Sequence, residues 1–170
     1  MSDYEGASVI LDLNEPAKPG TPQYDFVLDS GTIEHVFHIP NYFQNVHSLC
    51  KVGGYILHLT QSSGWMGHGF YLICPTLFWD FYEANGYRIV RAEIWQIPTN
   101  PALNRFFSII SYRPGIFPEG HVMGISAESY FMVMFIVQRL EHSTCNLLPI
   151  QTTYQRLHQL DRNTDRSRFT

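Results

Sequence analysis

Apolar residues in the first half of the chain recur either in short unbroken runs or at helical spacing, with polar turns between them. Residues 24–28 form a short run that is apolar except at Asp25, and this run predicts a buried parallel strand. Pro40 then begins a helix, because proline at a first helical position loses no hydrogen bond. The apolar stripe of this helix consists of Phe43, Val46, Leu49 and Cys50. After the Gly53-Gly54 turn, residues 55–59 predict a second strand, so the segment forms one β-α-β unit.

Similar patterns continue toward the C-terminus. Residues 75–85 predict a helix that Gly86 ends. Its buried stripe consists of Leu77, Phe78, Phe81 and Tyr82. Residues 87–97 and 130–139 predict two further strands, and a buried helix is the alternative for the second of these runs.

The remaining segments have a weaker period. Residues 8–13 predict a short strand that precedes a proline-rich loop. Residues 98–129 predict a long loop, and a loop of this length in a compact domain is usually functional or disordered. Residues 151–170 predict a polar, arginine-bearing tail with a short helix over residues 154–160. We therefore expect one domain over residues 1–150, followed by this tail.

The composition fits a globular domain rather than a disordered chain, since 45% of the 170 residues are hydrophobic and 15% are aromatic. The formal net charge of −4 gives no electrostatic case for nucleic acid as a partner. The longest apolar run, residues 130–137, is too short to span a bilayer, and residues 1–5 lack the features of a signal peptide. We expect a cytoplasmic protein without a membrane partner. The three cysteines show no metal or redox spacing, which predicts buried thiols.

The histidines raise the alternative of a metal-binding protein, because imidazole is a common ligand of zinc and iron. The candidates are His35, His38, His58 and His68. His35 and His38 are three positions apart and would share one helical face. Since no cysteine or carboxylate pattern completes a familiar metal motif, we expect no metal site.

Between residues 24 and 55 the chain contains, in this order, the motifs Leu28-Asp29, Glu34-His35-Val36 and Lys51-Val52-Gly53-Gly54. With this ordered set the segment resembles the class I S-adenosylmethionine-dependent methyltransferases. The stretches Asp3-Tyr4-Glu5-Gly6-Ala7 and Gly67-His68-Gly69-Phe70-Tyr71 extend the resemblance, which covers residues 2–90 well.

The resemblance implies an α/β fold, with a Rossmann-like sheet that carries helices on both faces. The strands over residues 87–97 and 130–139 would form an antiparallel pair at one edge of this sheet. The insertion at residues 98–129 would cover a methyl acceptor, and the cofactor would be S-adenosylmethionine.

Three residues near the N-terminus are candidate contacts for the adenine end of that cofactor. Asp12, Leu13 and Asn14 follow the strand expected over residues 8–13, and such a position can hydrogen-bond adenine in the family. A turn and cap formed by Asp12 and Asn14 is the alternative.

A second set of candidates follows the strand over residues 24–28. The resemblance implies that Asp29, Ser30 and Gly31, together with Glu34, border the methionine part of the cofactor. Open α/β sheets bind ligands at this edge, and Gly31 allows close approach of the backbone. A helix cap by Ser30 or Thr32 is an alternative that is compatible with this role.

Two histidines are the candidate catalytic residues. His35 is the best placed base if the acceptor is a hydroxyl or a protonated amine, because that group must lose a proton. His68 lies between two glycines, in a loop suited to acceptor contact. A purely structural role is the alternative for both residues.

The sequence also departs from the family, because it contains no glycine-rich loop of the G-x-G-x-x-G type and no second strand with a ribose-binding acid. We therefore expect a truncated form of the domain, whose outer strand over residues 8–13 is separated from the others by a gap. The exposed sheet edge predicts self-association.

The leading functional hypothesis is methyl transfer in the intact protein to a small-molecule or saccharide-like acceptor. Independent activity of this chain is then doubtful, because much of the cofactor's hydrogen bonding is missing. A non-catalytic interaction or regulatory module derived from a methyltransferase is the alternative, followed by a histidine metal-binding protein.

Overall fold

The computed structural model describes residues 6–117 and 128–155, except the side chains of residues 104–106. The strands are β1 (Tyr24–Ser30), β2 (Cys50–Ser63), β3 (Arg88–Pro98), β4 (Ser108–Ser111) and β5 (Ser129–Gln138). The helices are α1 (Ile39–Leu49) and α2 (Pro75–Ala84), with 3₁₀ helices η2 (Ile33–His35) and η3 (Pro101–Phe106).

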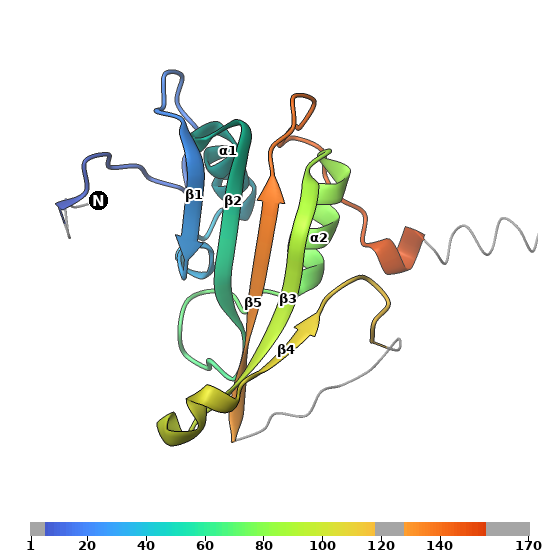
Figure 1. Ribbon diagram of the computed structural model, residues 1–170. Helices are drawn as coiled ribbons and strands as arrows, with labels where there is room; N and C mark the ends of the chain where they lie inside the picture. The colour runs from blue at the N-terminus through green and yellow to red at the C-terminus, as the bar shows by residue number, and fades with distance from the viewer. Residues whose placement is uncertain (1–5, 118–127, 156–170) are drawn as a thin grey trace, which may run out of the picture.

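The five strands form one mixed sheet in the order β1-β2-β5-β3-β4 (Figure 1). The β1–β2 pair is parallel, and the other three pairs are antiparallel. The expected antiparallel pairing of the strands over residues 87–97 and 130–139 is confirmed by β3 and β5. This pair does not form the sheet edge, however, because β4 pairs with the outer side of β3.

Both α-helices lie on the same face of the sheet, behind it in the view of Figure 1. They meet there through stacked rings of Phe43 and Phe81, whose centroids are 3.8 Å apart. The expectation of helices on both faces is therefore wrong for the part of the chain that the structure describes. The α/β class is confirmed, while the sheet is mostly antiparallel.

The buried core fills the space between the sheet and the two helices. Val133, Phe135 and Val137 of β5 are its central strand residues, with 0% of their surfaces exposed. The predicted stripes of both helices are confirmed in part: Phe43 and Val46 of α1 are buried, Leu49 and Leu77 are half-buried, and the buried Cys50 belongs to β2. In α2 the buried stripe residues are Phe78, Phe81 and Tyr82. Apolar side chains at helical spacing thus place both helices on the sheet.

The opposite side of the sheet, which we call the open face, carries exposed apolar side chains. Its members include Phe26, Leu28, Tyr55 and Ile109. Phe26 is 53% exposed and Leu28 is 60% exposed. The prediction of a parallel strand at residues 24–28 is confirmed, but its predicted burial is wrong. β1 lies at the edge of the sheet, and every second residue of it points away from the helices.

The predicted strand over residues 8–13 is wrong, since this segment contains no strand. The Asn14 N–H donates to Asp12 Oδ1 at 3.0 Å, which forms the local turn considered as the alternative. A polar side chain that satisfies its own backbone competes with strand pairing, and here the local turn forms instead.

The predicted loop over residues 98–129 contains both η3 and β4, so it extends the sheet in part. Ile110 of β4 packs against the core, while its neighbour Ile109 is 51% exposed. Residues 118–127 of this segment lie outside the described residues. Toward the C-terminus, residues 152–155 are helical, and the rest of the helix predicted over residues 154–160 lies outside the described residues as well.

Two further expectations concern the cysteines and the membrane. Cys50 is buried as predicted, Cys145 is half-buried, and Cys74 is exposed, contrary to the prediction of buried thiols. Among the described residues, no helix has the length and apolar character needed to cross a membrane.

Candidate functional site

The polar loop after β1 folds back over the carboxyl ends of β1 and β2. Gly31 has a φ of +76°, a conformation that favours glycine, and its N–H donates to Leu59 O at 3.0 Å. Asp29 Oδ1 accepts from the Thr32 N–H at 2.9 Å. Thr32 is the N-cap residue of η2, but its side chain makes no capping hydrogen bond. The side chain that caps this loop is therefore Asp29 rather than Ser30 or Thr32.

Asp29 points into the core, where it belongs to a buried hydrogen-bond network. His58 Nδ1 lies 2.9 Å from Asp29 Oδ2, and the Tyr42 hydroxyl donates to the same oxygen. His58 Nε2 lies 2.5 Å from the Tyr82 hydroxyl. Asp29 is 2% exposed and His58 0% exposed. The network thus connects β1 and β2 with both helices.

The charge state of Asp29 follows from opposing effects. Burial alone would raise the pKa of its carboxyl group, but the hydrogen bond and charge of His58, aided by Tyr42 and the Thr32 N–H, hold the pKa below its ordinary value. The side chain therefore stays ionised in the core. Its direct contact with a cofactor remains a prediction, since its oxygens already bind partners within the protein.

Ser30 and Gly31 are the members of the predicted methionine-side set that solvent reaches. Ser30 is exposed and Gly31 is half-buried. Glu34 is 2% exposed, and its Oε2 accepts from the Thr60 hydroxyl at 2.8 Å. A Cβ atom at Gly31 would come within 3.3 Å of Glu34 Oε1. The absence of a side chain at Gly31 thus leaves room beside the Glu34 carboxylate.

The two candidate catalytic histidines lie side by side, although they belong to different loops. The ring centroids of His35 and His68 are 4.9 Å apart, and the planes cross at 69°. Both side chains are exposed. Trp65 packs beside His68 at a centroid distance of 5.5 Å, and its indole N–H is buried without a hydrogen-bond partner among the described residues.

Backbone contacts fasten the His68 loop to Glu34. The N–H of Phe70 donates to Glu34 O at 2.7 Å, and Gln61 Nε2 donates to His68 O at 2.7 Å. A Cβ atom at Gly69 would lie 2.8 Å from Glu34 O, so only glycine allows this close approach. The fold thereby brings Glu34, His35 and His68 together, with their ligating atoms all within 4.8 Å of one another.

The other histidines considered for a metal site lie elsewhere. His38 is the N-cap of α1, where its Nδ1 accepts from the Asn41 N–H at 3.2 Å. His58 belongs to the buried network described above. The predicted pairing of His35 with His38 on one helical face is wrong, because His35 ends η2 and His38 precedes α1.

The predicted adenine-side residues lie against the start of α1. Asn14 Oδ1 accepts from the His38 N–H at 3.0 Å, and the Asn41 side chain donates to Asn14 O. Leu13 packs against the core, and hydrogen bonds from Asn14 lower the pKa of Asp12. The structure thus shows a role of this segment in capping α1, while its contact with a cofactor stays a prediction.

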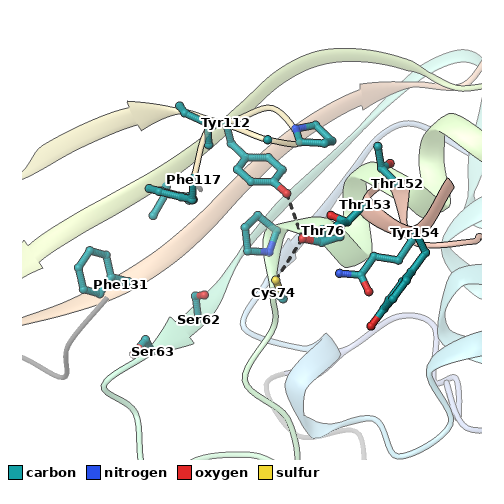
Figure 2. Close-up of a pocket in the computed structure, with 16 residues that line it drawn as sticks. Ser62, Ser63, Cys74, Thr76, Tyr112, Phe117, Phe131, Thr152, Thr153 and Tyr154 are labelled. Atoms are coloured by element: carbon teal, nitrogen blue, oxygen red, sulfur yellow. Dashed lines mark hydrogen bonds between the residues drawn. The ribbon is translucent and has the colours of Figure 1, made fainter. Parts of the chain in front are cut away.

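A cavity of about 550 Å³ opens beyond the carboxyl end of β2, between the start of α2 and the segment after β4. Figure 2 shows hydroxyl and aromatic side chains on its walls. They include Ser62, Ser63, Thr76, Tyr112, Phe117 and Tyr154. Tyr112 and Thr76 are linked through their hydroxyl groups at 3.0 Å, and the exposed thiol of Cys74 lies 3.3 Å from the Thr76 hydroxyl.

Sequence reasoning missed the residues of this cavity, because they come from segments far apart in the chain. It also missed Thr60 and Gln61, the buried polar residues that support Glu34 and His68. Their signal was present, however: two consecutive polar residues end an apolar strand run, and buried polar side chains require partners.

Comparisons with known proteins do not assign the chain to a family. No protein-family model matches the sequence, and no curated protein matches it at a significant level.

Proposed function

We propose that this protein takes part in S-adenosylmethionine-dependent methyl transfer to a small, hydroxyl-bearing acceptor. The observation that carries the proposal is the meeting of His35 and His68 at the carboxyl end of the parallel β1–β2 pair. Ligands of open α/β sheets bind at this edge. The ordered motifs from Leu28 to Gly54 support the choice of reaction.

The cofactor supplies a methyl group on a positively charged sulfur. Of the residues present, the exposed Ser30 and the backbone at Gly31 fit a contact with it, because solvent reaches both. Asp29 fits a positioning role, since its carboxylate holds the Thr32 N–H and thereby the shape of the loop.

The chemistry assigned to the chain is removal of the acceptor proton. A hydroxyl oxygen attacks the methyl carbon as the carbon–sulfur bond breaks, and the proton must go to a base. His35 and His68 are exposed imidazoles that can accept it. Which of the two accepts the proton depends on the position of the acceptor.

The cavity beyond β2 supports a small acceptor with several hydroxyl groups. Its volume of about 550 Å³ lies within the range of small-molecule sites, roughly 300–1,000 Å³. Serine and threonine hydroxyls offer hydrogen bonds, and aromatic rings such as Phe131 and Tyr154 offer flat apolar surfaces. This combination suits a saccharide-like molecule.

A nuclear magnetic resonance titration of the full chain with S-adenosylhomocysteine tests the proposal. We expect weak binding, because the sequence has no glycine-rich loop that would let the protein backbone come close to the cofactor. Amide shifts should cluster at Ser30, Gly31 and His35. Shifts scattered over the surface, or no shifts at millimolar ligand, would contradict a cofactor site at this loop.

The open face favours a second candidate, a non-catalytic interaction module. Phe26 and Leu28 are more than half exposed on a sheet face that no described helix covers. Large exposed apolar patches often mark interaction sites. Absence of cofactor shifts combined with concentration-dependent association of the chain would favour this candidate over methyl transfer.

A further inference from the structure

We propose that Glu34, His35 and His68 bind one divalent transition-metal ion such as zinc. Two imidazole nitrogens and one carboxylate oxygen form a ligand set found in catalytic zinc sites, where water or substrate takes the fourth position. The site does not depend on the proposed methyl transfer, because it concerns binding alone.

The geometry lies close to that of a metal site. The ligating atoms of the three residues lie within 4.8 Å of one another. Zinc at about 2.0–2.2 Å from each ligand would place them roughly 3.4 Å apart in a tetrahedral site. The required approach is at most about 1.4 Å, and the two imidazoles are exposed side chains whose rotation would bring their nitrogens closer.

Residues that would not contact the metal hydrogen-bond the proposed ligand residues, as in known metal sites. The Thr60 hydroxyl donates to Glu34 Oε2 at 2.8 Å and so orients the carboxylate. Thr60 is fully buried, with 0% of its surface exposed. Gln61 holds His68 through its backbone carbonyl, at 2.7 Å.

The loop that carries His68 is also organised before any ligand binds. Its backbone is fastened to Glu34 O by the N–H groups of Phe70 and Tyr71, at 2.7 and 3.3 Å. Since residues two and three positions after His68 thus contact Glu34, the neighbour of His35, little ordering of the chain is needed on binding. Preorganisation of this kind strengthens binding by lowering its entropic cost.

The competing explanation is a simple contact between two aromatic rings. The edge-to-face arrangement of His35 and His68 is a common aromatic geometry. It does not account for Glu34, a buried carboxylate beside two exposed imidazoles. A metal ion accounts for all three groups, because the carboxylate of Glu34 and the two imidazoles can each supply one ligand atom to it.

Occupancy would alter the role of the histidines in the proposed reaction. A histidine that ligates zinc through its free nitrogen lone pair is no longer available as a base. The metal would then activate an acceptor hydroxyl by lowering its pKa. Metal binding and cofactor binding are therefore tested by different measurements, calorimetry with zinc and the resonance titration with S-adenosylhomocysteine.

Isothermal titration calorimetry of the full, tag-free chain with zinc chloride tests the site. We expect one zinc ion per chain in the wild type. The His68→Ala variant should lose more affinity than the roughly 10–100-fold that removal of a supporting residue costs. The Thr60→Val variant should fall within that 10–100-fold range, because it removes only the hydrogen bond to Glu34.

His142→Ala is the matched control, since His142 is also exposed but lies beside Gly86, away from the cluster. This variant should bind zinc as the wild type does. Circular dichroism and thermal melts verify that each variant is folded. Cobalt titration adds a spectroscopic measurement, because the visible absorption of bound cobalt reports its coordination.

Two results would overturn the proposal. The first is the absence of zinc binding by the folded wild-type chain at micromolar metal. The second is equal zinc affinity of the wild type and the His35→Ala/His68→Ala double variant, which would place the ion elsewhere.

Discussion

His58 Nδ1 lies 2.9 Å from the Asp29 carboxylate, and the two residues are cross-strand neighbours on the parallel strands β1 and β2. Because His58 also reaches Tyr82 of α2, this pair links the edge of the sheet to the helical layer. The same carboxylate holds the loop that leads to Glu34 and His35. The core network and the candidate site therefore share Asp29.

Replacement of Asp29 by asparagine should lower the free energy of unfolding by about 2 kcal/mol, because the buried groups of Tyr42 and His58 lose their carboxylate partner. Urea denaturation measures this change. The matched control is Asp25→Asn, which breaks the exposed pair of Asp25 with Lys51 and should change stability little. Equal effects of the two substitutions would contradict a special role of the buried network.

The Asp29 network should also weaken in acid. The pKa of the Asp29 carboxyl group is lowered in the folded chain. The contribution of this group to the free energy of unfolding is therefore present above the ordinary carboxyl pKa near 4, and it is lost as the pH falls through the lower pKa of the folded chain. In the Asp29→Asn variant, this part of the acid-induced loss should be missing. Urea midpoints measured from pH 5 downward compare the two chains.

His47 gives a separate pH dependence in a higher range. Burial, and then the charge of Arg139, lowers its pKa from 6.5 to about 4. Between these values the unfolded chain binds a proton that the folded chain does not, so stability should fall as the pH drops from 6.5 to 4. Because the imidazole is only half-buried, solvent screening reduces the effect of this shift, and we expect a loss on the order of 1 kcal/mol. His47→Gln should remove this part of the profile, whereas His142→Gln should keep it.

Gly69→Ala should disturb the candidate site through the backbone. Gly69 has a φ of +72°, and an added Cβ would lie 2.8 Å from Glu34 O, so the loop must move. We expect loss of the contact between His35 and His68, visible as changed histidine side-chain resonances. Gly67→Ala is the control, because Gly67 has a φ of +80° but no atom within 4 Å of an added Cβ. Both variants share a conformational cost of about 1–2 kcal/mol, and only Gly69→Ala should separate the rings.

The exposed edge at β1 should cause self-association. Leu28 is 60% exposed on the open face, next to the unpaired side of this strand. Leu28→Lys should shift the chain toward the monomer in sedimentation velocity experiments. Leu148→Lys makes the same chemical change at a residue that is 85% exposed in the C-terminal segment. A monomeric wild type at high concentration, or equal effects of the two variants, would argue against this interface.

Thiol labelling can probe the cavity beyond β2. Cys74 is exposed and lines the cavity, whereas burial raises the pKa of the Cys50 and Cys145 thiols. Iodoacetamide should therefore modify Cys74 first, as measured by mass spectrometry of the intact chain and its peptides. A molecule bound in the cavity should slow this reaction, which provides a competition assay for acceptors.

Much of the local structure follows from hydrophobic periodicity, as the two helices show. The spacing of Phe43 and Val46 predicts the buried side of α1, and Pro40 marks its beginning. Periodicity could not tell an edge strand from an internal one, because the apolar run of β1 looks the same in either place. The missed strand β4 is four residues long, too short to give a periodic signal.

The candidate site was only partly predictable for a related reason. The sequence indicated a polar loop that contains Asp29 and His35, and the glycines on both sides of His68 indicated a second loop. That the two loops touch depends on the hydrogen bonds of Glu34 O, which no local pattern contains. The inward direction of Asp29 likewise depends on His58, its neighbour on another strand.

The position of β5 also bears on how the chain folds during synthesis. This strand pairs with both β2 and β3, yet it follows the other four described strands in the chain and so is synthesised after them. Until residue 138 is available, β2 and β3 have no native partner between them, and their edges are open to wrong pairing. Formation of the sheet must therefore wait for contacts that are distant in the sequence, and such topologies fold slowly. Chains that stop before β5 should be recognised by chaperones and proteases as unfolded.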